Sequence, residues 1–258
     1  MHLESSYLNV PLAGLQSFLL VLARVAGAVS FVPFPGFSNG ADAARVALAL
    51  GLTAALAPLW PAVALPEPLV GSLVAALASE AAFGLTVGLA VAILIESLLV
   101  AAQVFGLQAG YSYASTIDPS TQADSNLLLV LAQLSGGLLF FALGLDRQIL
   151  RVFAASLVAH PPGTFFLARS SIDTVIGLGS AMFTTGVRLA MPVVVLLALI
   201  DISLALLGRI HQQIQLLTLA FPVKMLAALA FLGLVFVLFL PVYRTAAEHT
   251  IAALFRLL

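Results

Sequence analysis

Long apolar segments separated by short polar ones fill most of the chain, and this pattern predicts an all-α integral membrane protein. It gives about six hydrophobic segments, at residues 10–32, 43–60, 69–102, 127–145, 175–207 and 216–240. A helix of about 20 apolar residues crosses the hydrocarbon core of a bilayer. Several segments are too short or too long for that, and prolines and charges interrupt them. We therefore expect broken helical hairpins rather than a bundle of simple spans.

Composition indicates the same class of protein. Of the 258 residues, 62% are hydrophobic and only 8% are charged, whereas a soluble domain carries about 25% charged residues. The chain has no cysteine, which excludes disulfides and thiolate chemistry. A net charge of −1 without a basic run argues against nucleic acid as a partner.

One polar stretch, residues 100–126, interrupts the apolar pattern in the middle of the chain. Asp118 and Pro119 predict a turn there, and Gly106 and Gly110 have the four-residue spacing that lets another backbone approach closely. Irregular backbone at membrane depth must be covered by protein or line a water-filled cavity, because its peptide groups would otherwise lose their hydrogen bonds. The stretch is therefore a candidate pore or gate element. The alternative is a polar connection between two helices, which is the more frequent case.

Six charged residues interrupt the apolar segments: Arg24, Glu80, Glu96, Arg188, Asp201 and Lys224. Each would cost about 2.5 to 3.5 kcal/mol at the centre of a membrane helix, so we expect them to face partners, water or one another. Structural ion pairs explain such residues more often than a proton relay does. A stand-alone secondary transporter with a site at Glu80, Glu96, Arg188 and Asp201 is the alternative, although the chain shows no two similar halves.

Enzyme signatures are absent from the sequence. It contains no H-E-x-x-H motif, no G-x-S-x-G nucleophile elbow and no P-loop, and His160 and His211 lack the spacing of metal ligands. Gly177 and Gly179 lie inside an apolar run, where they predict a close contact between helices. We expect a protein without catalytic residues, metal or cofactor.

Four blocks, in the same order along the chain, resemble the FliR family, the export-gate subunit of flagellar and injectisome type III secretion (SctT-like in the injectisome). The central block reads Gln103-x-x-Gly106-x-Gln108-x-Gly110-Tyr111, followed by Ala114-x-x-x-Asp118-Pro119. The other blocks are Arg24 with Pro33-Phe34-Pro35-Gly36 and Arg45, Ser156 with Pro161-Pro162-Gly163, and Leu206-x-Gly208-Arg209 with Phe221-Pro222-x-Lys224. One departure is Gln212, where the family usually has proline, while Gln213 keeps the family glutamine.

The resemblance implies a non-enzymatic pore component in the bacterial inner membrane, at the flagellar basal body. Such a subunit assembles with FliP-like and FliQ-like subunits, is contacted by an FlhB-like subunit, and passes unfolded proteins outward. The flagellar branch is favoured over the injectisome, because the block from Ser156 to Gly163 is closer to it.

The resemblance also implies roles for individual residues. The chain would be a single domain with N-terminal helices at 1–104, a plug-like loop at 105–126 and C-terminal helical hairpins at 127–258. The gate or plug residues are Phe105, Gly106, Gln108, Gly110, Tyr111, Asp118 and Pro119. The expected contacts to other subunits are Arg24, Glu80, Arg209, Gln213 and Lys224.

Overall fold

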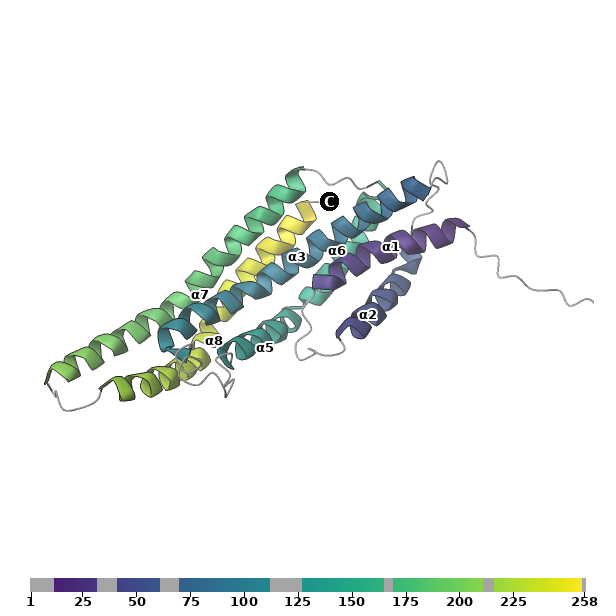
Figure 1. The fold of residues 1–258 in the computed structure, drawn as a ribbon. Coiled ribbons are helices and arrows are strands. Elements are labelled where there is room, and N and C mark those ends of the chain that lie inside the picture. Colours follow the sequence, from purple (N-terminus) through teal and green to yellow (C-terminus); the bar gives the residue numbers. More distant parts are fainter. Residues whose placement is uncertain are drawn as a thin grey trace, which may run out of the picture. The chain divides into compact units, whose positions relative to one another are not determined.

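The computed structural model of the chain describes residues 12–31, 41–60, 70–111, 127–164, 169–210 and 216–256. These residues form helices and their connections without a strand, which confirms the all-α prediction (Figure 1). The helices are α1 (Leu12–Phe31), α2 (Ala41–Ala55), the short 3-10 helix η1 (Ala57–Leu59), α3 (Val70–Ala109), α5 (Leu127–Ala142), α6 (Leu145–Ala159), α7 (Arg169–Ile210) and α8 (Leu216–Arg256).

Two of the overlong apolar segments are single helices rather than broken ones. Helix α3 has 40 residues and α7 has 42, and α7 continues past Pro192. Helix α8 likewise continues past Pro222 and Pro241 to Arg256, whereas the sequence predicted a span that ends near residue 240. Long flanking runs of helix-forming apolar residues therefore outweigh the hydrogen bond that each proline removes.

Three described helical segments are long and apolar enough to cross a membrane: Gly14–Phe31, Gly71–Ala109 and Ile172–Arg209. The pair Leu128–Ala142 and Leu145–Ala159 adds a fourth if it counts as one broken span. This agrees with the predicted integral membrane protein, although the sequence suggested about six segments. The segment at 43–60 contributes only a 15-residue helix followed by η1, which is too short to cross.

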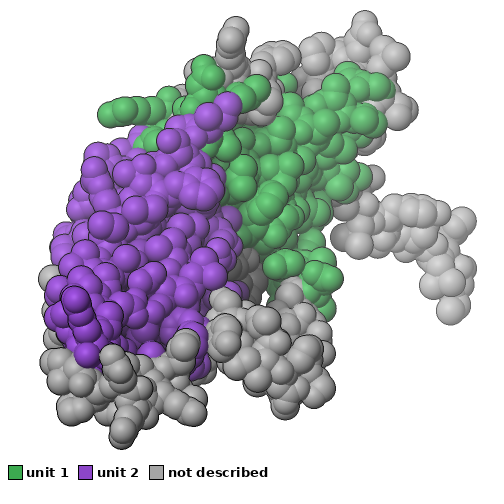
Figure 2. All heavy atoms as spheres, turned by 60° about the vertical axis from the view of Figure 1, so that its left-hand side comes forward, with its two compact units in different colours: residues 1–91, 147–175, 253–258 green, residues 92–146, 176–252 purple. Residues whose placement is uncertain are grey.

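The chain divides into two compact units, coloured separately in Figure 2. Unit 1 contains residues 1–91, 147–175 and 253–258, and unit 2 contains residues 92–146 and 176–252. Helices α3, α7 and α8 therefore contribute residues to both units.

Unit 1 is built on a close approach of α1 to the first half of α3. A Cβ atom on Gly84 or Gly88 would collide with backbone atoms of Arg24 and Ala28, so these two glycines let the helix backbones touch. Leu20, before Arg24 on α1, packs against Ala76, before Gly84 on α3, and this matched order shows that the two helices run parallel. Helix α2 packs against α1 (Figure 1).

Unit 2 joins the second half of α3 to α5, α7 and α8. Gly186 of α7 lies against Ser97 and Val100 of α3, and Gly136 of α5 lies against Ile95 and Leu98. Helices α7 and α8 run antiparallel, because residues 178–185 share a cavity with residues 246–250 while Asp201 contacts Lys224. Residues 93–97 of α3 line the same cavity and Gln108 bonds to Asp201, so α3 runs parallel to α7.

Candidate functional site

Helix α3 ends at the predicted gate stretch, five residues later than the sequence suggested. The predicted loop began at Phe105, but residues 105–109 are helical, and Gly110 follows with φ +86° and an N–H that donates to the Leu107 carbonyl at 3.1 Å. A glycine in the left-handed region is a common helix stop, because other residues are strained there. Asp118 and Pro119 lie outside the described residues.

Gly110 is also required by its surroundings. A Cβ atom there would lie 2.6 Å and 2.9 Å from two ring carbons of Phe221 on α8. Gly106, by contrast, has Leu128 Cδ1 at 3.5 Å as the nearest atom to a built Cβ, which is an ordinary contact. The close approach suggested by the four-residue spacing therefore occurs at Gly110 and not at Gly106. The side chain of Phe105, one residue before Gly106, is fully buried.

A polar cluster joins the end of α3 to both α7 and α8. Gln108 Nε2 donates to Asp201 Oδ2 at 3.2 Å, and Lys224 Nζ donates to the same oxygen at 3.0 Å and lies 2.9 Å from Oδ1. The Lys224 side chain is 13% exposed and that of Asp201 is 41% exposed. The lysine neutralises a carboxylate on an otherwise apolar helix, which is how such a charge is tolerated.

Tyr111 makes a second link to α8 beside this cluster. Its hydroxyl donates to the Met225 carbonyl at 3.0 Å, one residue after Lys224. Burial raises the pKa of Tyr111 above its usual value, so the hydroxyl stays protonated and remains a donor at physiological pH. Gln108 in the last turn of α3 and Tyr111 just after Gly110 therefore both bond toward α7 and α8.

Unit 1 holds a second, fully buried cluster around Arg24. Its Nε donates to Glu80 Oε2 at 2.5 Å, its Nη1 to Ser156 Oγ at 3.0 Å and its Nη2 to the His160 carbonyl at 3.0 Å. The guanidinium carbon lies 4.8 Å from the ring centroid of Phe83. The planar fork of arginine thus serves three acceptors at once, which lysine could not do in this geometry.

A tight turn after α6 completes this cluster. Thr164 N–H donates to the Pro161 carbonyl at 3.0 Å, and Gly163 has φ +90°, which with Pro162 before it is the pattern of a type II turn. The turn presents the Gly163 N–H to Glu80 Oε1 at 2.8 Å. Both Glu80 oxygens are therefore bonded, and the block from Ser156 to Gly163 serves to bind the buried pair.

The expected contacts to other subunits differ in their surroundings. Arg24 and Glu80 have no exposed surface and are bonded inside unit 1, so they offer no surface to a partner. Lys224 is bonded to Asp201. Arg209 is exposed in the last turn of α7, and Gln213 lies outside the described residues.

Asp201 lies beside the gate stretch, although the sequence pattern did not predict it there. The available signal was a lone carboxylate in an apolar run, and only the fold identifies Gln108 and Lys224 as its partners. The four residues of the alternative transport site do not form one centre of charge: Glu80 and Asp201 are neutralised by separate partners, and Glu96 and Arg188 are exposed.

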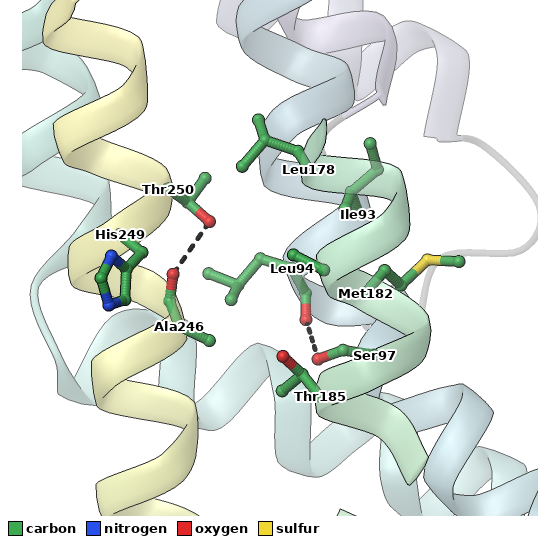
Figure 3. Close-up of a pocket in the computed structure, with 10 residues that line it drawn as sticks. Ile93, Leu94, Ser97, Leu178, Met182, Thr185, Ala246, His249 and Thr250 are labelled. Carbon is green, nitrogen blue, oxygen red and sulfur yellow. Dashed lines mark hydrogen bonds between the residues drawn. The ribbon is translucent and has the colours of Figure 1, made fainter. Parts of the chain in front are cut away.

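A cavity in unit 2 lies between α3, α7 and α8. It measures about 170 Å³ and is lined mainly by apolar side chains (Figure 3). Ser97 and Thr250 donate to carbonyls of their own helices, Leu94 at 2.6 Å and Ala246 at 2.9 Å, as the dashed lines in Figure 3 show. The described residues contain no group of three or more acidic, histidine or cysteine side chains that could hold a metal.

The prediction of a close helix contact at Gly177 and Gly179 is wrong. A Cβ atom at either position would meet no described atom within 4 Å. Both glycines therefore lie on an open side of α7, which sequence spacing alone does not reveal.

Comparison with known proteins covers almost the entire chain. The family model of bacterial export proteins, family 1, matches residues 15–250. The flagellar biosynthetic protein FliR of Escherichia coli (strain K12) is 24% identical over 247 residues, which cover 96% of this chain and 93% of that protein. FliR of Pectobacterium carotovorum is 25% identical, with 94% and 91% covered, and FliR of Caulobacter vibrioides is 28% identical, with 83% and 86% covered. With a family match of this extent, the chain belongs to family 1 of the bacterial export proteins, the FliR family.

Proposed function

We propose that the chain is a subunit of the flagellar type III protein export gate. With FliP-like and FliQ-like subunits it forms the inner-membrane conduit for unfolded flagellar proteins, and an FlhB-like subunit contacts it within the basal body. The family match over residues 15–250, together with relatives named as flagellar biosynthetic proteins, carries this proposal.

The surface of α7 supports a role inside a larger assembly. Large apolar side chains are exposed along one side of the helix at Ile176, Phe183, Val187, Met191, Val195, Leu199, Ile202 and Leu206. From Phe183 to Leu206 their spacing is three or four residues, which forms a continuous apolar stripe. Such a stripe requires lipid or other protein to cover it, since contiguous apolar patches of this size mark membrane or protein contacts.

The length of α3 supports the same role. A helix of 40 residues is about 60 Å long, whereas the hydrocarbon core of a bilayer is about 30 Å thick. Part of α3 must therefore lie outside the hydrocarbon, and an assembly that extends beyond the membrane would cover it.

We assign residues 105–122 the role of a plug that closes the conduit. The described part of this segment supports the assignment, because its first residues are fixed by Gly110 against Phe221 and by Tyr111 bonded to α8. A gate segment needs such a fixed base if it is to return to the same closed position.

The proposed role requires no catalysis by this chain, and energy comes from other components. The polar clusters support this, because Arg24 with Glu80 and Asp201 with Lys224 are mutually neutralised pairs rather than an acid and a base aimed into a cavity. Neither pair lines the cavity of unit 2.

Deletion of residues 110–116 in the native host tests the plug. The shortened chain should still assemble into the export apparatus, while the inner membrane becomes permeable to ions, measured with a potential-sensitive dye. Assembled complexes that keep a tight seal would contradict the plug.

Removal of the whole chain should abolish secretion of flagellar proteins, and unchanged secretion would contradict the export function itself.

A further inference from the structure

The end of α3 is attached to α8 by side chains whose roles the family match does not assign. Four residues take part, and together they are called the α3 latch: Gln108, Tyr111, Asp201 and Lys224. Gln108 and Lys224 meet at one carboxylate oxygen of Asp201, and Tyr111 bonds to the backbone of Met225. All of these residues belong to unit 2, so their contacts lie within one compact body.

The latch constrains both the position and the rotation of the end of α3. One attachment is Gln108 in the last turn of α3, which reaches Lys224 of α8 through Asp201, and the other is Tyr111 just after Gly110, which bonds to Met225. A single attachment would leave the helix end free to rotate about it. Two separate attachments prevent that rotation, and the Phe221 ring packed on Gly110 limits movement toward α8.

Asp201 is the residue on which the latch depends. It accepts from donors on two different helices, so its loss removes the bond between the end of α3 and α7 and leaves the Lys224 ammonium without its carboxylate. Hydrogen bonds to a charged group are stronger than those between neutral groups. The side chain is 41% exposed, so a competing polar group can reach it, and the attachment can be broken and remade.

We propose that Asp201 is a positioning residue for closure of the export conduit. Through Gln108 and Lys224 it holds the end of α3 on α8, and so sets the place from which the following segment starts. The latch in its intact form stabilises the closed conduit, and its release favours the open one. This inference rests on the proposed export function.

The test measures ion leak through assembled complexes in the native host. Asp201→Asn keeps the side-chain shape and removes the charge, and Lys224→Gln removes the opposite charge. Each should raise the leak on the order of tenfold at equal assembly, since loss of one charge-assisted hydrogen bond shifts a two-state ratio by about that factor. The exchange of both residues, Asp201→Lys with Lys224→Asp, should restore part of the seal that either single variant loses.

Milder variants cover the case in which a charge change prevents assembly. Gln108→Met and Tyr111→Phe each remove one hydrogen bond with little change in shape, and both should leak more than wild type. The matched control is Glu248→Gln, which breaks the exposed pair Arg244–Glu248 on the same helix and should leave the seal unchanged. Rescue by charge exchange distinguishes a positioning role from a general loss of stability.

The outcomes separate the latch from the plug. The deletion of residues 110–116 serves as the leaking reference. If that deletion leaks while assembled Asp201→Asn and Gln108→Met complexes stay as tight as wild type, the latch is wrong and the plug remains. If the deletion itself does not leak, the plug on which the latch rests is contradicted.

Discussion

Arg24 carries a positive charge into a site with no exposed surface, and the arrangement around it explains how the fold tolerates this. Glu80 supplies the opposite charge, Ser156 and the His160 carbonyl accept from the remaining donors, and the Gly163 N–H bonds the second carboxylate oxygen. A buried pair contributes little when compared with well-packed apolar residues, but the loss of one partner leaves an uncompensated charge.

We therefore expect Glu80→Gln and Arg24→Met to destabilise unit 1 by about 3 to 5 kcal/mol. The amount of folded protein in the membrane and its thermal unfolding in detergent measure the effect. The double variant, Arg24→Met with Glu80→Met, should recover much of the loss because no unpaired charge remains. The exposed pair Arg244–Glu248 is the control, and Glu248→Gln should cost less than about 1 kcal/mol. Equal losses in the buried and the exposed pair would contradict this explanation.

Gly110 has both a left-handed backbone conformation and a crowded Cβ position, whereas Gly144 has only the left-handed conformation. The φ of +86° at Gly110 strains any other residue, and its surface is covered by the Phe221 ring. Gly144 has φ +65° with no described atom within 4 Å of a built Cβ, so it has the strain without the crowding. Gly144→Ala should cost about 1 to 2 kcal/mol from the left-handed conformation alone. Gly110→Ala should cost more in the same unfolding measurement, and part of the excess should disappear on combination with Phe221→Leu.

At the scale of elements, the approach of α1 to α3 depends on glycines whose neighbours are backbone. A Cβ on Gly84 would collide with the Arg24 carbonyl, which cannot rotate away as a side chain can. The same approach positions Arg24 beside Glu80, one turn before Gly84. Close packing of these helices and formation of the buried ion pair are therefore coupled.

Gly84→Ala should destabilise the chain by about 1 to 3 kcal/mol, because the added methyl forces the two helix backbones apart. Gly177→Ala is the matched control on an open helix side, and it should be neutral or stabilising by up to about 1 kcal/mol through helix propensity. Thermal unfolding of the two purified variants compares them. Equal stability of both would show that α1 and α3 do not need close contact.

The apolar runs were sufficient to predict helices and a membrane protein, but not where the helices end. The prolines in α7 and α8 suggested breaks, and both helices continue past them. The glycine pairs suggested close contacts, and one occurs at Gly110 but none at Gly106 or Gly177, because spacing does not show which side of a helix has a neighbour. Gly110 ends α3 because of its own left-handed backbone conformation, which a glycine in the sequence can indicate.

At the scale of the whole molecule, the charges in the apolar segments were predicted to find partners, and four of the six do so in two pairs. The partners lie far apart in sequence: Arg24 with Glu80, and Asp201 with Lys224. Sequence patterning does not contain such long-range pairings, so the fold was needed to identify them. Glu96 and Arg188 are exposed on apolar helices, where contact with another subunit would satisfy them.

Purification of the tagged chain from its own host membrane in mild detergent, followed by mass spectrometry of what accompanies it, tests the export-gate function most directly. We expect one large particle that contains FliP-like and FliQ-like subunits. Glu96→Gln and Arg188→Gln variants, purified in parallel, should lower the yield of that particle if these charges lie at subunit contacts. Recovery of the wild-type chain as a lone monomer or homodimer would contradict the proposed function.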